Sequence, residues 1–235
     1  MPRARRSAKS TATATQPVDA ASQSDLAYAR LREAIIALEL QPGQMYSETH
    51  LASFAKLGRT PVREALHRLI REELVTPRRN RGIQITPIDI IRHLQLLDVR
   101  RALEQLLVDR ASKHATQDER RIMLQLATDT EAAIASNNMV KLLHLNSQVQ
   151  DLKVQAAHNE ILTSTMDLFY GLSRRFWFAY APHIEGSRES ASLLHVKTLR
   201  CIAIGNRDEA IQATNELMDF LESFTRRTID LKVRI

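Results

Sequence analysis

Two arginines and a histidine lie at helical spacing between residues 58 and 69, in the sequence Gly-Arg-Thr-Pro-Val-Arg-Glu-Ala-Leu-His-Arg-Leu. An arginine guanidinium donates two parallel hydrogen bonds, a geometry that matches the O6 and N7 acceptors of guanine in the major groove of DNA. Arg59, Arg63 and His67 fall outside the apolar positions of this segment, so they face solvent if it is helical. The pattern predicts a helix that recognises base edges. The alternative is an ordinary solvated helix face.

A start signal and an apolar stripe indicate the helix itself. Thr60 is a suitable N-cap, and Pro61 suits the first helical position because its missing N–H would be unpaired there in any case. Apolar residues then recur at helical spacing, namely Val62, Ala65, Leu66, Leu69 and Ile70. We therefore expect a helix that is capped by Thr60 and packs one face inward.

Shorter elements flank this segment. Apolar spacing predicts a preceding helix that ends before the turn at residues 41–43 and carries Leu31, Ile35 and Leu38. Ser47 is a good N-cap for a second short helix, with Glu48 favourably placed in its first turn. Residues 74–77 and 82–86 have the composition of two short strands, with a basic tip between them. Three helices followed by a basic β-hairpin predict a winged helix-turn-helix over residues 25–87.

Residues 26–87 resemble the DNA-binding domain of GntR-type bacterial transcription regulators. The resemblance rests on Leu40-Gln41-Pro42-Gly43, Ser47-Glu48, the run from Arg59 to Leu66, Leu69 and Arg81-Gly82. It implies that Arg59 and Arg63 contact bases and that Thr60 contacts a backbone phosphate. It also implies that Gly82 lets the wing enter the minor groove, while Arg79 and Arg81 are expected to grip the DNA more evenly across sequences. Gly58 and Thr49 depart from the family pattern, and the second departure affects one DNA contact.

The composition agrees with a DNA-binding protein. The formal net charge is +6 and the isoelectric point is about 9.8, which supplies the attraction to phosphate that duplex binders use. The single cysteine, Cys201, excludes an internal disulfide framework and fits a reducing cytoplasm. Residues 1–24 are basic and lack an apolar segment, so we expect a disordered tail rather than a secretory signal. No apolar run is long enough to span a membrane.

The pattern changes after Pro87 to successive long helices, which predicts an all-α antiparallel bundle over residues 88–230. Helical segments are expected near 88–113, 117–136, 139–157, 160–181, 187–204 and 206–230. In the first of them, a shared inward face is expected for Leu96, Val99, Leu103, Leu106 and Leu107. The fold class is therefore mainly α, with a winged helix-turn-helix followed by a helical bundle.

This second region resembles the helical ligand-binding domain (FCD type) of the FadR-like branch of the GntR family. The matching pieces are Asp98 to Glu104, Asn159 with Leu162, and His195 followed by Leu199 and Gly205. The resemblance implies that the bundle forms a homodimer and binds a small organic acid. Many relatives hold a metal ion with one aspartate and three histidines. The corresponding positions here are Asn146, Gln150, His195 and Leu217, so we expect neither a metal nor another cofactor.

The same positions suggest a ligand site without metal. Arg100 lies between apolar residues, so its guanidinium is expected to face inward and to pair with a ligand carboxylate. Asn146, Gln150 and His195 would supply hydrogen bonds, and Trp177, with Phe176 beside it, would supply an apolar or stacking wall. Three alternatives stay open. Arg100 could bridge to Glu104 one turn on, Asn146 and Gln150 could bond each other, and Trp177 could be plain core.

These observations predict a cytoplasmic, homodimeric transcription regulator, most simply a repressor that recognises a palindromic operator in double-stranded DNA and is modulated by a small carboxylate metabolite. The alternative is an architectural DNA-binding dimer without an effector. An enzyme is not expected, because the sequence has no nucleophile elbow, paired carboxylates or phosphate-binding glycine loop.

Overall fold

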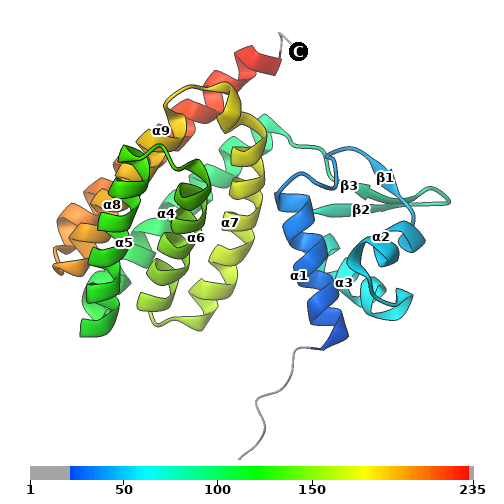
Figure 1. Ribbon diagram of the computed structural model, residues 1–235, viewed down its shortest axis with the longest axis horizontal. Helices are drawn as coiled ribbons and strands as arrows, with labels where there is room; N and C mark the ends of the chain where they lie inside the picture. Colours follow the sequence, from blue (N-terminus) through cyan, green and yellow to red (C-terminus); the bar gives the residue numbers. More distant parts are fainter. Residues whose placement is uncertain (1–21, 233–235) are drawn as a thin grey trace, which may run out of the picture.

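The computed structural model describes residues 22–232 and divides into two lobes (Figure 1). The N-terminal lobe contains three helices and a small sheet, and the C-terminal lobe is a bundle made only of helices. The predicted fold class is thus confirmed. Most of the predicted N-terminal tail lies outside the described residues. Its last part, residues 22–24, instead begins the first helix.

The N-terminal lobe contains α1 (Gln23–Ile36), α2 (Glu48–Ala55) and α3 (Arg59–Arg71). Ser47 caps α2 as predicted, since its hydroxyl accepts a hydrogen bond from the His50 N–H. The predicted cap of α3 is wrong. Gly58 is the N-cap, no side chain caps the helix, and Thr60 and Pro61 already lie inside its first turn. Glycine tolerates the extended cap conformation almost as well as serine, which makes the hydroxyl dispensable.

A three-stranded antiparallel sheet forms the wing, with the strand order β1-β3-β2. Strands β2 (Val75–Arg78) and β3 (Gly82–Ile85) were predicted to within a residue, but the two-residue strand β1 (Met45–Tyr46) was not. Met45 and Tyr46 pair with Gln84 and Ile83. A strand this short has no periodicity of its own, so only pairing with β3 defines it.

Gly82 is where β1 and the wing come closest. Its φ is +95°, and a Cβ at this position would lie 2.5 Å from the carbonyl oxygen of Tyr46. Both the backbone conformation and this close approach require glycine. The glycine therefore has a packing role in the free protein, besides the DNA role that the family resemblance implies.

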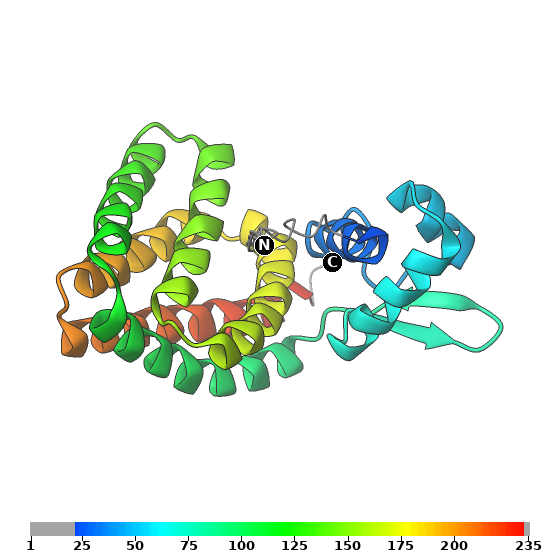
Figure 2. The ribbon, with the colours of Figure 1, turned by 90° about the horizontal axis from the view of Figure 1, so that it is seen from below.

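The bundle comprises α4 (Ile90–His114), α5 (Gln117–Ala135), α6 (Met139–Ala156), α7 (Glu160–Tyr180), α8 (Ser187–Ala203) and α9 (Arg207–Lys232), with a short 3-10 turn at Ala181–His183. Each helix lies within two residues of its predicted bounds, because local signals set the ends. Thr116 and Glu119 form a capping box at α5, while Asn138 and Asn159 cap α6 and α7. Helices α4 and α9 pack along each other, and α4 forms one long edge of the bundle (Figure 2).

The predicted inward face of α4 is wrong in part. Val99 and Leu106 are 54% and 47% exposed, whereas Leu107 is buried. The face that points into the bundle instead carries Leu97, Arg100, Glu104, Leu107, Val108 and Ala111. Two inward positions are thus occupied by charged residues, Arg100 and Glu104. A prediction based on apolar residues alone therefore placed the inward face of α4 on the wrong side of these positions.

The two lobes meet where α1 packs against α7 (Figure 2). The Arg32 guanidinium donates to Glu72 within the N-terminal lobe at 2.9 Å and to the Asp167 carbonyl on α7 at 2.9 Å. A Cβ on Gly171 would lie 2.6 Å from the Arg32 guanidinium, so glycine at this position lets the helices approach. Leu172 packs against the core of the N-terminal lobe. The DNA-binding lobe is therefore directly connected to a helix of the bundle.

Candidate DNA-binding surface and ligand pocket

The predicted DNA-contacting side chains lie exposed on α3 and on the wing. Arg59, Thr60 and Arg63 are exposed on the first turns of α3, and Arg79 and Arg81 are exposed at the tip between β2 and β3. The inward face of α3 is apolar and carries Val62, Ala65, Leu66 and Leu69. The wing tip lies at the end of the protein away from the bundle (Figure 1), and both it and α3 carry exposed arginines.

Arg63 has a partner that was not anticipated. Its Nε donates to Oε2 of Glu48, the first residue of α2, at 2.6 Å, and both side chains are well exposed. An exposed ion pair of this kind contributes only about 0–1 kcal/mol to stability. The pair orients Arg63 at low cost and can open when a stronger acceptor is present.

Inside the bundle, a small cavity of about 70 Å³ is lined by all five predicted effector-binding residues, Arg100, Asn146, Gln150, Trp177 and His195. These residues come from α4, α6, α7 and α8. The sequence hypothesis therefore selected side chains that the fold brings together. Phe176, predicted beside Trp177, lines the cavity as well, and so do residues that the hypothesis missed, including His93, Ser147, Ser173, Arg174 and Phe224.

The polar centre beside this cavity is a buried cluster of three charges. Arg100 is 2% exposed and donates to Glu104 Oε1 at 2.9 Å, while the Lys153 amine lies 3.2 Å from Glu104 Oε2. Glu104 and Lys153 are fully buried. The bridge from Arg100 to Glu104, held open as an alternative, is thus present, and the sequence hypothesis missed Lys153. Lys153 follows Val149 by one helical turn on the buried face of α6. This helical spacing indicates that Lys153 faces inward, and it could have been read from the sequence.

The cluster has more positive than negative groups. Burial alone would raise the pKa of Glu104, but Lys153 and Arg100 outweigh burial and hold that pKa at about 2. Burial lowers the pKa of the Lys153 amine, and Glu104 opposes that shift. The Tyr170 ring lies 4.9 Å from the Arg100 guanidinium carbon and shields the cluster. One buried carboxylate thus faces two cationic side chains.

His195 is a buried, neutral imidazole. Burial and the nearby Lys153 lower the pKa of His195 to about 3, and its Nδ1 is buried without a partner. Asn146 does not bond to Gln150, because its amide donates to the Ser192 hydroxyl at 2.9 Å. The Asn146 Oδ1 is also buried without a partner. Both atoms belong to residues that line the cavity.

Trp177 combines the two roles considered for it. Its ring packs 4.5 Å from that of Phe224 within an apolar cluster, and the residue also lines the cavity. The neighbouring Phe176 stacks on His93 with ring centroids 3.8 Å apart. Burial and Arg100 lower the pKa of His93 to about 3, so this ring is neutral too.

The residues at the family's metal position do not fit a divalent metal ion. Two are neutral amides, and Leu217 is a fully buried core residue. Only His195 offers a ligand that zinc prefers. No group of three histidine, cysteine or acidic side chains that could hold a metal ion occurs within residues 22–232.

Both lobes match known protein families. Residues 23–85 match the bacterial regulatory proteins of the gntR family, and residues 95–220 match the FCD domain. The chain therefore belongs to the GntR family, in the FadR-like branch with an FCD domain. It is a DNA-binding transcription regulator and not an enzyme, as predicted. None of the described helices is long and apolar enough to cross a membrane.

Two relatives in sequence are transcription regulators. The HTH-type regulator YdhC of Bacillus subtilis is 28% identical over 141 residues, or 60% of this chain and 63% of YdhC. The Nta operon transcriptional regulator of Aminobacter aminovorans is 30% identical over 146 residues, or 61% of this chain and 67% of that protein. The match thus spans less than two thirds of the length of YdhC.

Two solved structures share the fold. McbR/YncC of E. coli superposes with a TM-score of 0.76 at 16% identity and covers 89% of this chain and 100% of that chain. A GntR regulator from Rhodococcus sp. RHA1 has a TM-score of 0.69 at 20% identity, with 87% and 98% covered. Likenesses at such identities support the architecture alone.

Proposed function

We propose that this regulator binds a small carboxylate in the bundle cavity and that the ligand changes its affinity for a palindromic operator, most simply as a cytoplasmic repressor that the ligand releases. The observation that carries the proposal is the set of unsatisfied polar atoms around the cavity. Buried side-chain atoms without a partner belong to His93, Asn146, Ser173, Arg174 and His195, all of which line it. Each such atom costs about 1–3 kcal/mol unless a ligand or water satisfies it.

The charge of the cavity favours an anion. Arg100 and Lys153 share the single carboxylate of Glu104, and Arg174 adds another guanidinium whose Nε is unsatisfied. A carboxylate ligand would complete the pairing, and the neutral imidazoles of His93 and His195 can donate or accept. Arg100 already pairs with Glu104, so it is not reserved for the ligand as the sequence predicted. We infer that the ligand carboxylate is the second anion of a cluster that Glu104 only half neutralises.

The volume limits the size of the ligand. A cavity must have a volume of about 10–15 Å³ to hold one water molecule. The bundle cavity, at about 70 Å³, therefore has room for a few non-hydrogen groups. A short carboxylic acid fits this space without rearrangement, whereas a larger one would have to displace Trp177 or Phe176.

Coupling to DNA would run through α4 and α7. Helix α4 begins five residues after β3 and contributes Arg100 to the cavity, and α7 contributes Trp177 while packing against α1. A ligand that favours one arrangement of these helices would shift the position of the winged lobe. The shift in DNA affinity cannot exceed the difference in the ligand's affinity for the two arrangements.

A second copy of the chain is proposed to pack on the outer face of α4. Its exposed positions recur at intervals of three and four residues and include Ile91, Val99, Ala102 and Leu106. Such a spacing suits antiparallel or parallel helix pairing across a two-fold axis, which an inverted-repeat operator would mirror. Val99→Asp with Leu106→Asp should yield a monomer in analytical ultracentrifugation, and an unchanged dimer would place the interface elsewhere.

Selection of bound genomic fragments by the purified protein, followed by sequencing, tests the DNA part. An inverted repeat is expected, and the enzymes encoded beside it indicate the class of acid to test. Recovery of fragments without a shared motif, in the presence and absence of those acids, would favour the architectural dimer.

The effector part is tested with Arg100→Met. Lys153 and Glu104 then remain as a neutral pair, so folding and operator binding should persist while the response to the acid is lost. Arg101→Met is the matched control, because Arg101 is partly exposed and pairs with Asp219 on α9, away from the cavity. Equal loss of response in both variants would contradict the proposed site.

A further inference from the structure

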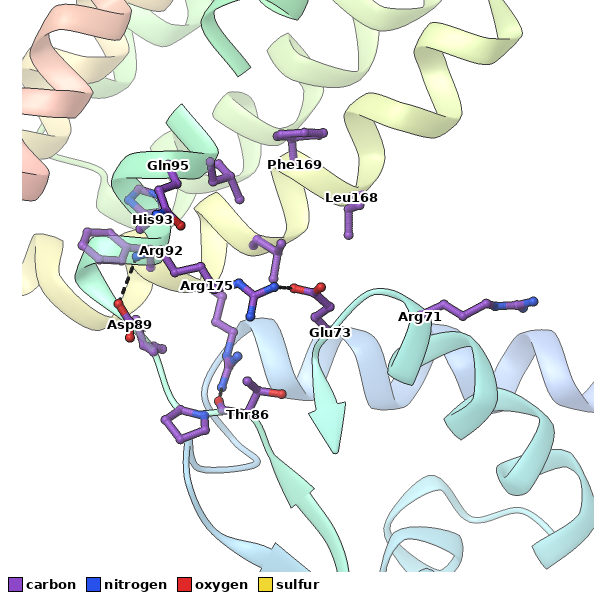
Figure 3. A pocket seen from close by; sticks show the side chains of 15 residues that line it. Arg71, Glu73, Thr86, Asp89, Arg92, His93, Gln95, Leu168, Phe169 and Arg175 are labelled. Atoms are coloured by element: carbon purple, nitrogen blue, oxygen red, sulfur yellow. Dashed lines mark hydrogen bonds and ion pairs between the residues drawn. The ribbon is translucent and has the colours of Figure 1, made fainter. Parts of the chain in front are cut away.

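A second and larger cavity, of about 320 Å³, lies at the junction of the two lobes (Figure 3). The DNA-binding lobe contributes Arg71, Glu73 and Thr86. Residues 87–89, the start of α4 and the middle of α7 contribute the rest. Its volume lies at the lower end of the range of small-molecule sites. Nothing in the function proposed above uses this space.

Arg175 is the notable residue of the junction cavity. It is 3% exposed, and one of its amino groups donates to the main-chain carbonyl of Thr86. Its Nε is buried without a partner, and Arg175 forms no ion pair with any side chain in the described part of the chain. Burial lowers the pKa of Arg175 to about 10, so the group is still a cation at neutral pH. A buried cation without an anion is costly, which indicates a missing partner.

The carboxylates at the cavity are engaged elsewhere. Glu73 pairs with the Arg92 guanidinium, and Asp89 caps α4 by accepting from the Arg92 N–H. Figure 3 shows the guanidinium of Arg92 directed at Glu73 and that of Arg175 directed at Thr86. The Thr86 hydroxyl is also buried without a partner. Arg175 Nε and the Thr86 hydroxyl are therefore both available to donate a hydrogen bond to a ligand.

The rest of the lining is mostly apolar. It includes Pro87, Leu96, Leu168, Phe169, Leu172 and Phe176. An apolar wall beside one buried cation matches a ligand with an apolar body and a single carboxylate. A fully hydrated ion such as sulfate would leave this wall unused.

We propose that the junction cavity binds an apolar monocarboxylate, whose carboxylate pairs with Arg175 and Thr86 and whose body packs on Leu168, Phe169 and Leu172. The site is separate from the bundle cavity, since the stacked rings of His93 and Phe176 line both and stand between them. Binding here does not depend on the proposed function. Only its effect on DNA binding does, because the ligand would bridge Thr86 at the end of the wing to α7.

Isothermal titration of the full chain with phenylacetate, and with the uncharged phenylacetamide, tests the site. Phenylacetate should bind measurably and phenylacetamide should not. Arg175→Met should weaken phenylacetate binding by about 10- to 100-fold, the loss expected for a charge-assisted hydrogen bond. Arg226→Met is the matched control, because Arg226 is exposed and pairs with Glu222 on α9. No binding of phenylacetate to the wild type, or equal binding to Arg175→Met, would overturn the proposal.

Two further variants exclude a merely structural role for Arg175. Leu168→Trp fills the cavity while keeping the cation, and it should also abolish binding. Arg175→Met should melt no lower than the wild type, because it removes an unpaired buried charge and leaves the apolar stem. Arg175 would have a role in folding alone if Arg175→Met melted clearly below the wild type and Leu168→Trp still bound phenylacetate. Arg100→Met should retain phenylacetate binding, so failure of the bundle site and failure of the junction site are distinguishable.

Discussion

The core of the winged lobe contains apolar side chains only, whereas the core of the bundle encloses Arg100, Glu104, Lys153 and two histidines. DNA binding belongs to the winged lobe, and the ligand site that we propose lies inside the bundle. The winged lobe places its arginines on exposed turns because duplex DNA approaches from outside. The bundle encloses its charges, an arrangement that suits the proposed small ligand because low polarity there strengthens each interaction.

The difference has an energetic consequence. Exposed arginines on α3 and the wing cost the fold almost nothing and can be exchanged without unfolding. Buried charges in the bundle depend on each other, so that removal of one affects the others. Mutations of recognition residues in the winged lobe should therefore leave stability unchanged, whereas loss of Glu104, the anion that Arg100 and Lys153 share, should destabilise the bundle. Substitutions in the two lobes test this contrast.

Glu104→Gln should lower the free energy of unfolding by about 3–5 kcal/mol, because it leaves Arg100 and Lys153 buried without an anion. Glu216→Gln is the control, since Glu216 pairs with Lys197 on the surface and should cost at most about 1 kcal/mol. Urea unfolding followed by circular dichroism measures both. Similar losses in the two variants would mean that the bundle does not depend on its buried charges.

Arg59→Ala and Arg63→Ala should each weaken operator binding by about 1–3 kcal/mol and relax specificity at one base pair. Arg79→Ala and Arg81→Ala should weaken binding to operator and unrelated DNA alike. Fluorescence anisotropy with both kinds of duplex measures this, with melting temperatures as the check that stability is unchanged. Identical behaviour of all four variants would remove the distinction between base contacts and phosphate contacts.

Acid should destabilise the bundle through its neutral histidines. The pKa of His93 is about 3 in the folded protein and about 6.5 in the unfolded chain, so only the unfolded chain takes up a proton between these values. The stabilising contribution is complete above about pH 6.5 and falls as the pH decreases, by about 2 kcal/mol at about pH 5. His93→Phe keeps a ring against Phe176 but cannot titrate. Between neutral pH and about pH 5, this variant should lose about 2 kcal/mol less stability than the wild type, as measured by urea unfolding. An equal loss in both proteins would show that His93 takes up protons in the folded state.

Helix capping gives the smallest effect. Ser47→Ala should cost about 1 kcal/mol because its hydroxyl caps α2. Thr60→Ala should stay within about 0.5 kcal/mol of the wild type, because Thr60 lies inside α3 rather than at its cap. A larger loss for Thr60→Ala than for Ser47→Ala would restore the capping role first predicted for Thr60.

The sequence by itself determined the order of the helices and the bounds of those in the bundle, because their ends depend on local signals such as Asn138 and Asn159. It also determined which arginines are exposed on α3, since helical spacing fixes the face on which each residue lies. Only the tertiary structure decided the features that depend on contacts between residues distant in the sequence. It paired β1 with β3, turned Val99 and Leu106 outward, and joined Lys153 of α6 to Glu104 of α4 across 49 residues. It also left Arg175 buried between the lobes. A cavity and the charge balance inside it depend on several elements at once, so no local pattern could specify them.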